Sequence, residues 1–379
     1  MSITTRTRDK VAFPVVYLIL AAIVVFGLIL GIIRLVLGLG ATTNLSDYYP
    51  WGLWIAFDFF AVPFSAGAFT LAAVVHIFNQ EKYHGIARLA VLAGFLGYLM
   101  VILVLLLDIG RWDQFYSVLL PWRWNLHSFM FEVSMSITMY FGVLILELIP
   151  IVFKQREWMP AQLIDQLIAL IASAGILLST VHQGSIGAIF LVLSHKLHPL
   201  WWTPIMPLLF LISAVFSGLS VAVFVAIVAG RALRKPVPMQ LLTGLAKVVA
   251  IVQSIYLVLK IGDLLVAGEI GLVFGSGWLS VLFLVEIIIG VILPLIIFAS
   301  RARESEGNLL TGTICTLVGL ALNRSLISWF ALRVPAGATY FPHWMEIVIV
   351  IAAFAAAILL FSLGVRYLPV FPEHAAEKS

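Results

Sequence analysis

Ten apolar runs, each long enough to cross a bilayer as a helix, follow one another along this chain of 379 residues. A helix needs about 20 predominantly apolar residues to span the ~30 Å hydrocarbon core. A β-barrel would instead show short segments of alternating polarity. We therefore expect an all-α integral membrane protein, with one polytopic domain over residues 1–379. The expected spans lie near residues 14–37, 51–78, 86–107, 127–153, 163–193, 204–229, 241–265, 276–299, 308–330 and 343–367.

The composition excludes the main classes of soluble protein. Apolar residues make up 63% of the chain and charged residues only 11%, whereas about a quarter of a typical soluble domain is charged. A mean hydropathy of +1.12 cannot be hidden in a soluble core, because folding leaves much of the surface in water. Soluble enzymes, nucleic-acid binders and disordered scaffolds are therefore excluded.

Metal and haem sites lack ligands in this sequence. One cysteine, Cys315, provides neither a disulfide nor the four thiolates of an iron–sulfur cluster. A membrane haem needs two axial histidines at matched depth on neighbouring helices, and His182 alone among the eight histidines lies deep in a span. We therefore expect no intrinsic haem, iron–sulfur cluster or metal, so that any cluster lies in a partner chain.

Basic residues predict the orientation in the membrane. With ten spans, both termini lie on one side, and 15 of the 22 Lys and Arg residues lie at that side. Cytoplasmic loops carry an excess of Lys and Arg. We therefore expect both termini in the cytoplasm and a multi-pass protein of a bacterial inner membrane. The tryptophans near the outer ends are interpreted mostly as an interfacial aromatic belt.

Four polar side chains are expected in the outer half of the membrane: Asp58, Tyr98, Glu132 and His182. Charged groups at such depth cost several kcal/mol and are functional candidates by default. A quinone head group has two carbonyl oxygens that need hydrogen-bond donors, and its reduction takes two electrons and two protons. An imidazole and a carboxylate suit both tasks, although transporters bury similar groups.

Each of these groups also has a structural interpretation, because depth alone does not show that they meet. Asp58 could pair with Arg111, Tyr98 could simply pack, and Glu132 could be solvated near the outer loop. His182 could bond a carbonyl group on a neighbouring helix.

Other buried charges leave two interpretations open. Glu286 and Arg324 form either a functional pair or a structural ion pair inside the bundle. Lys260, Asp263 and Glu269 lie at span ends, where we expect them to be solvated.

A second set of residues suggests a proton route. Glu132 and Glu147 are fifteen residues apart on the fourth expected helix, which separates them by about 60° in azimuth and about 22 Å in depth. Ser134, Ser136, Thr138 and Tyr140 lie between the two and could order water. We expect a route through Glu132, Tyr140 and Glu147; the alternative is that Glu147 faces cytoplasmic water.

Several motifs together resemble one family. They are Pro50-Trp51-Gly52-Leu53-Trp54-Ile55-Ala56-Phe57-Asp58, Asp108-Ile109-Gly110-Arg111, Asn125-Leu126-His127-Ser128 before Phe131-Glu132, His182-Gln183-Gly184-Ser185-Ile186-Gly187, His198-Pro199-Leu200-Trp201 and Gly337-Ala338-Thr339-Tyr340-Phe341-Pro342. Over nearly the whole chain the sequence resembles the NrfD/PsrC family of quinone-interacting membrane subunits. Within that family it is most similar to the ten-helix HybB-like branch of the hydrogenase-2 type.

The resemblance implies a fold and a function. The fold would be two four-helix bundles plus two further helices, without a complete catalytic centre of its own. The subunit would exchange electrons between the quinone pool, menaquinone or ubiquinone, and a periplasmic ferredoxin-like four-cluster iron–sulfur protein. That protein would connect to catalytic subunits, such as a [NiFe] hydrogenase. Asp58, Tyr98, Glu132 and His182 fall on family positions implicated in quinone or proton handling, and His127 joins them as a candidate.

Two positions depart from the family pattern. HybB-like chains carry a Glu after the Phe that corresponds to Phe224, and here that place is Val225. A proton path through that Glu is therefore in doubt. His127 stands where a small amide is expected, which bears on the quinone site.

The outer loops are the expected docking surface for the iron–sulfur partner. They are rich in Trp, Tyr, Pro and Arg, and aromatic and Arg side chains are enriched at interface hot spots. We expect Arg111 and Arg123 to anchor the partner. The competing hypothesis is a secondary transporter or proton channel without a redox role, which a co-purified iron–sulfur protein would exclude.

Overall fold

Ten helices of the computed structural model are long and apolar enough to cross a membrane. The structure describes residues 15–77, 79–152, 161–235, 237–368 and 370, and within them it is helical apart from loops and one isolated β-bridge. The spans are formed by α1 (Val15–Leu37), α3 (Leu53–Ala72) with η1 (Ala73–Ile77), α4 (His84–Asp108), α5 (Phe129–Val152), α6 (Ala161–Val192), α7 (Met206–Leu233), α8 (Met239–Val266), α10 (Trp278–Ile287) with η5 (Ile288–Ile292) and α11 (Leu293–Ala299), α12 (Glu306–Ser325) with η7 (Leu326–Phe330), and α13 (Trp344–Tyr367). The predicted all-α membrane fold with ten spans is confirmed.

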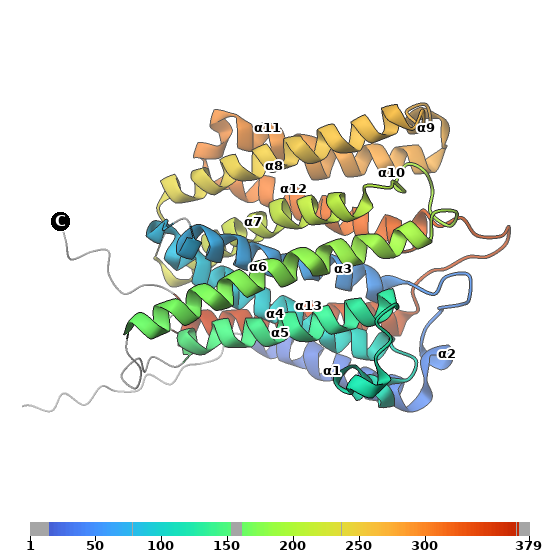
Figure 1. Ribbon diagram of the computed structural model, residues 1–379, viewed down its shortest axis with the longest axis horizontal. Coiled ribbons are helices and arrows are strands. Elements are labelled where there is room, and N and C mark those ends of the chain that lie inside the picture. Colours follow the sequence, from blue (N-terminus) through green and yellow to red (C-terminus); the bar gives the residue numbers. More distant parts are fainter. Residues whose placement is uncertain (1–14, 78, 153–160, 236, 369, 371–379) are drawn as a thin grey trace, which may run out of the picture.

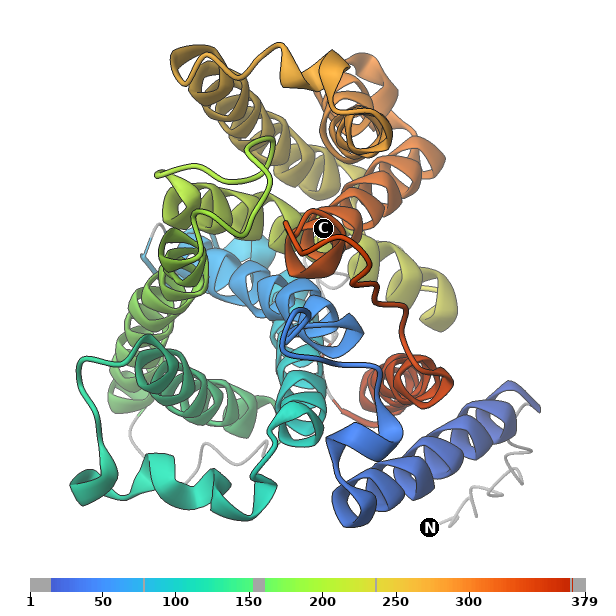
Figure 2. The same ribbon diagram turned by 90° about the vertical axis from the view of Figure 1, so that its right-hand side faces the viewer.

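The spanning helices form two bundles and a flanking pair. Helices α3, α4, α5 and α6 pack together as the N-terminal bundle, and α7, α8, α12 and the α10–η5–α11 span form the C-terminal bundle. Helices α1 and α13 pair with each other beside α4 (Figures 1 and 2). This is the predicted arrangement of two four-helix bundles plus two further helices.

One end of the helix array carries the longer loops, and we call it the loop face. Figure 2 looks onto this face. It bears the short helices α2 (Leu39–Thr42), η3 (Trp112–Leu119), η4 (Pro121–Arg123) and α9 (Leu272–Gly275). The opposite face bears η2 (Glu81–Tyr83) and η6 (Arg301–Glu304). Some of the basic residues counted on the side of the two termini lie outside the described residues: Arg6, Arg8, Lys10, Lys154, Arg156 and Lys378.

Small residues join the two bundles at the contact between α3 and α7. Gly67 and Gly218 face each other so closely that a Cβ on Gly67 would overlap the Gly218 carbonyl group. Helices in membranes associate mainly by close van der Waals packing, which small residues permit. The two glycines therefore fix the distance between the bundles.

Gly67→Val should prevent the bundles from packing. The added side chain meets backbone atoms, which cannot move aside as a flexible side chain can. We expect folded protein in membranes to fall at least tenfold, measured by size-exclusion of a fluorescent fusion. Gly142→Val on α5 is the control, because nothing lies within 4 Å of a Cβ at that position. Equal accumulation of the two variants would contradict the tight contact.

Candidate functional site

Buried polar side chains gather inside the N-terminal bundle. Asp58 on α3, Tyr98 on α4, Tyr140 on α5 and His182 on α6 are each at most 4% exposed. We call these four residues the N-terminal polar cluster. Three of the four members were expected at the quinone site, and Tyr140 was expected on the proton route.

Three rings of the cluster pack against one another. The ring centroids of Tyr98 and Tyr140 are 4.9 Å apart, those of Tyr98 and His182 5.9 Å, and those of Tyr140 and His182 6.3 Å. Tyr98 and His182 both lie ten residues from the loop-face ends of their helices, which is ~15 Å of rise. Asp58 is close enough for its charge to act on Tyr98. The structure thus brings Asp58, Tyr98 and His182 together, which depth along the helices alone did not show.

Most polar atoms of the cluster lack a hydrogen-bond partner among the described residues. These atoms are both carboxylate oxygens of Asp58, the hydroxyl of Tyr98 and Nε2 of His182, whereas the Tyr140 hydroxyl lies beside Ser65 and Ser179. Native proteins leave few buried polar groups unpaired, and each such group costs about 1–3 kcal/mol. Four unpaired atoms in one place therefore indicate a site for a polar ligand or water.

His182 is held by Ser136, a residue that sequence analysis had assigned only to water ordering. Its Nδ1 lies 2.7 Å from Ser136 Oγ. The same hydroxyl lies 2.9 Å from the Val133 carbonyl oxygen, to which it can donate its one hydrogen. The imidazole is therefore fixed in orientation with Nε2 left for another partner.

Glu132 lies at the edge of the cluster. Its side chain is exposed, and its Oε1 accepts a 2.6 Å hydrogen bond from Ser185 Oγ on α6. Ser185 is three residues beyond His182 on the same helix. The Glu132–Ser185 hydrogen bond thus joins α5 to α6 about one helical turn from His182.

Two expected residues do not join the cluster. His127 is exposed in the loop before α5, where its backbone N–H donates to Asn125 Oδ1 at 3.2 Å. Arg111 pairs with Asp113 instead of Asp58, so the structural interpretation of Asp58 through Arg111 is wrong.

The α5 residues expected along the proton route divide between two faces of the helix. Ser134 and Thr138 bond backbone carbonyl groups of their own helix on its exposed side, away from Tyr140. Tyr140 is buried in the cluster, and Oε2 of Glu147 is buried without a partner among the described residues. Helical periodicity explains the division, because residues 134 and 138 project about 180° from the 136–140–147 face.

A second buried set, missed in the sequence, adjoins the N-terminal polar cluster on its loop-face side. Arg34 is fully buried and donates from Nη2 to the Ile109 carbonyl oxygen at 2.9 Å. Its charge acts on Asp108, which in turn acts on Asp58. The available signal in the sequence was an arginine near the end of one expected span, Arg34, and an acid directly after the end of another, Asp108.

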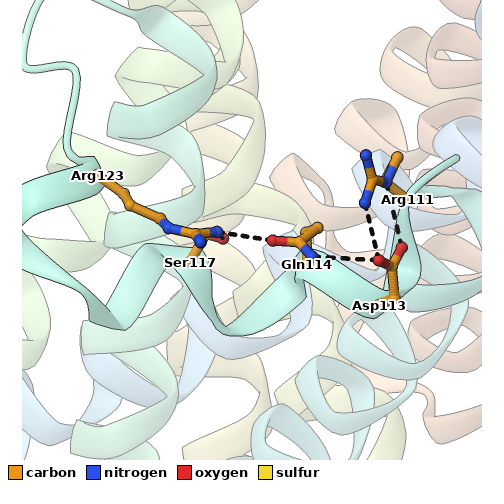
Figure 3. Close-up of polar contacts among 5 residues, drawn as sticks. All are labelled: Arg111, Asp113, Gln114, Ser117 and Arg123. Atoms are coloured by element: carbon orange, nitrogen blue, oxygen red, sulfur yellow. Dashed lines mark hydrogen bonds and ion pairs between the residues drawn. The ribbon is translucent and has the colours of Figure 1, made fainter.

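The η3–η4 loop carries the two arginines expected to anchor a partner (Figure 3). Arg111 Nη2 lies 3.0 Å from Asp113 Oδ2, and Arg123 Nη1 donates to Gln114 Oε1 at 2.6 Å. Gln114 also donates to Asp113. Hydrogen bonding to Arg111 lowers the pKa of the Asp113 carboxyl, and hydrogen bonding to Asp113 raises the pKa of Arg111. Both guanidinium groups remain exposed within this network.

Large apolar side chains are exposed around this network. They include Phe115 (58% exposed), Leu119 (60%) and Trp122 (78%). Aromatic and Arg side chains together are typical of interface hot spots. By contrast, Trp54 and Trp201 are 1% exposed and hydrogen-bonded, so the aromatic-belt interpretation is wrong for them.

Comparisons with known proteins agree with these features. A profile described as "Polysulphide reductase, NrfD" matches residues 41–336. The "Probable Ni/Fe-hydrogenase 2 b-type cytochrome subunit" of Escherichia coli is 31% identical, over 94% of this chain and 92% of that protein. The "Menaquinone reductase, integral membrane subunit" of Nitratidesulfovibrio vulgaris is 31% identical, over 89% of this chain and 87% of its own. A selenate reductase subunit of Mesobacillus selenatarsenatis is 25% identical, over 94% of each chain.

The words "b-type cytochrome" in one relative's name imply haem, so we tested whether the residues fit one. Among the histidines whose side chains the structure describes, His182 alone is buried, and its Nδ1 is engaged by Ser136. The described residues also contain no cluster of three or more His, Cys, Asp and Glu side chains. These residues do not fit a haem with two axial histidines.

Proposed function

The chain belongs to the NrfD family of polytopic membrane subunits, and from this premise we propose that it is the quinone-reactive membrane subunit of a multi-subunit oxidoreductase. The observation that carries the proposal is the set of unpaired buried atoms in the N-terminal polar cluster. Two relatives are by name a hydrogenase subunit and a menaquinone reductase subunit. The substrate would be menaquinone or ubiquinone.

We propose that His182 binds one quinone oxygen through Nε2. The Ser136 hydroxyl has one hydrogen and two acceptors in reach, Val133 O and His182 Nδ1. When Ser136 donates to Nδ1, Nε2 carries the ring hydrogen and donates to a quinone oxygen. When Ser136 donates to Val133, the ring hydrogen moves to Nδ1, and Nε2 can accept a proton from a quinol. Rotation of one hydroxyl thus suits the imidazole to both directions of turnover.

The remaining polar groups would complete the site. The Tyr98 and Tyr140 hydroxyls can donate to the second quinone oxygen or to water beside it. The head group would enter from lipid between α5 and α6, beside Glu132, and the isoprenoid tail would remain between these two helices. His127, in the exposed loop before α5, would act at the loop-face end of this entry.

The orientation follows from the charges. We propose that the loop face is periplasmic and both termini are cytoplasmic, in the inner membrane of a bacterium, because 15 of 22 basic residues lie at the other ends of the spans. A ferredoxin-like iron–sulfur protein would dock on the loop face and link this chain to its catalytic subunits, such as a [NiFe] hydrogenase.

Purification of the native complex from solubilised membranes tests the function. We expect an iron–sulfur protein to co-purify and the complex to reduce 2,3-dimethyl-1,4-naphthoquinone with reduced benzyl viologen as donor. A chain that purifies without a redox partner, and on which quinone has no effect, would favour a transporter or proton channel instead.

Labelling of engineered cysteines tests the orientation. A Cys315→Ser background with Ser46→Cys on the loop face should react with a membrane-impermeant maleimide in intact cells. The same background with Ser305→Cys on the opposite face should react only after the cells are broken. The reverse pattern would invert the side assignment.

Charge reversal tests the docking surface. Arg111→Glu with Arg123→Glu should lower the amount of iron–sulfur partner bound to membranes at least tenfold. The reason is that two exposed cations become anions within an aromatic surface. The matched control is Lys235→Glu with Arg301→Glu, which makes the same charge change on the opposite face. Full retention of the partner by the first variant would place docking elsewhere. The measurement is the partner's partition between membrane and soluble fractions.

A further inference from the structure

A second set of buried charges lies in the C-terminal bundle, apart from the N-terminal polar cluster. Glu286 is 3% exposed, and Lys260 and Arg324 are 2% exposed each. With Asn323 they form what we call the C-terminal polar cluster. The expectation that Lys260 would be solvated is wrong, because the α8 side chain turns into the bundle and lies 5.9 Å from the centre of the Phe283 ring.

Neutral donors hold the carboxylate of this cluster. Trp201 Nε1 donates to Glu286 Oε2 at 2.7 Å, and Asn323 Nδ2 donates to Oε1 at 2.8 Å. In the described chain no ion pair joins Glu286 to Lys260 or Arg324. Asn323 stands between the charges instead, since its Oδ1 accepts from Arg324 Nη1 at 2.9 Å. Of the two interpretations left open for Glu286 and Arg324, the structural ion pair is therefore wrong.

Residues of the cluster line two small cavities. One, of about 10 Å³, is bordered by Lys260, Arg324 and Asn323, and the other, of about 20 Å³, by Glu286 and Asn323. Tyr256 borders both. A polar cavity of about 10–15 Å³ holds one water molecule. Each cavity thus has room for about one water between groups that can exchange a proton.

The helices are irregular at the two charged positions. A π-helical turn, η5, begins two residues after Glu286, and another, η7, begins two residues after Arg324. Gly290 in η5 meets Gly319 of α12 so closely that a Cβ on Gly319 would overlap the Gly290 backbone. Single π-turns inside α-helices are frequent at functional sites.

We propose that the C-terminal polar cluster is a proton-transfer site, distinct from the quinone site, in which Glu286 binds and releases one proton. This inference rests on the proposed function, because quinone turnover would drive it. Since neutral groups hold the carboxylate, protonation breaks no ion pair. A proton leaves Lys260 Nζ, crosses the water positions and binds a Glu286 oxygen, which leaves a neutral amine and a neutral acid. Water at the loop-face end of α8, beside Asp263 and Glu269, then supplies a proton to the amine, and the cycle closes when Glu286 gives up its proton to water on the other side of the cluster.

Adjacent tryptophans connect this cluster to the helix of His182. Trp201 donates to Glu286, whereas Trp202 Nε1 donates to the Phe190 carbonyl oxygen of α6 at 3.1 Å. The same loop is tied to the segment after η7, because His198 N donates to Ala331 O at 2.9 Å. Trp201 is thus a positioning residue through which a movement of α6 would reach the Glu286 carboxylate.

The test uses the whole complex in liposomes, with reduced benzyl viologen as donor and the naphthoquinone as acceptor. Charge moved per electron pair is read with a potential-sensitive dye, and turnover is measured with a protonophore present. Glu286→Gln should lower the charge per electron pair about twofold and leave uncoupled turnover within twofold of the unmodified complex. Glu304→Gln, on the opposite face, is the control for loss of a carboxylate.

Trp201→Phe carries the test if Glu286→Gln does not assemble, because it removes the indole N–H and keeps an aromatic ring. It should also lower the charge per electron pair, whereas Trp278→Phe on the exposed start of α10 should not. Two results would overturn this inference and leave the proposed function intact. One is unchanged charge movement in both Glu286→Gln and Trp201→Phe. The other is an unmodified complex that reduces quinone but moves no charge. An unmodified complex that does not reduce the naphthoquinone overturns the proposed function instead.

Discussion

His182→Ala should abolish quinone reduction while the complex remains assembled. The substitution removes the one ring nitrogen of the N-terminal polar cluster that has no partner, and it leaves the Ser136 hydroxyl bonded to Val133. We expect quinone-linked turnover to fall at least a hundredfold, which corresponds to about 2.7 kcal/mol of transition-state stabilisation. Dye-linked activity of the catalytic partner, which does not pass through the membrane subunit, should stay within twofold.

Two companion variants separate chemistry from folding. His195→Ala removes an exposed loop histidine and should leave quinone turnover unchanged. Ser136→Ala keeps the imidazole but frees its orientation, so we expect a smaller loss, about tenfold, with a shifted pH profile. Quinone activity that survives His182→Ala, in a complex that elutes as the unmodified one does, would move the site away from this cluster.

The spans could be predicted closely because bilayer thickness fixes their length. The chain needs about 20 apolar residues per crossing. Apolar run length alone predicted a span at 86–107, and the structure has α4 at 84–108. The same argument gives depth along each helix. It correctly assigned Tyr98 and His182 to the half of the helices nearer the loop face.

Lateral position could not be predicted in the same way, since it depends on which helices pack together. Depth did not show that Tyr140 would meet Tyr98 and His182, or that Lys260 would point inward from a helix end. Helical periodicity could have placed Ser134 and Thr138 on the opposite face of α5. Burial of Arg34 became visible only once α1 packed beside α4 and α13.

The departure at Val225 narrows the choice of proton routes in the N-terminal half. Val225 on α7 is 8% exposed and apolar, so no carboxylate serves a route at that position. Glu147 on α5 remains the acidic side chain below Tyr140. Its charge acts on Tyr140, and its Oε2 is buried without a partner in the described chain. This placement favours the route over the alternative that Glu147 simply faces water.

Glu147→Gln should stop the N-terminal bundle from supplying quinone protons across the membrane. Glu147 lies seven residues, or ~10 Å, beyond Tyr140, so a protonatable group there can pass protons between the cytoplasmic side and the cluster. We expect turnover with a protonophore to stay normal, because protons can then reach the quinone from the loop face. Charge moved per electron pair in liposomes should fall at least twofold. Each charge moved through 100 mV costs about 2.3 kcal/mol, and protons taken up from the loop face would reach the quinone without crossing the membrane. Glu81→Gln, an exposed carboxylate on the same face, is the control. Unchanged charge movement in Glu147→Gln would leave this residue as a structural acid and would assign any proton translocation to another part of the chain.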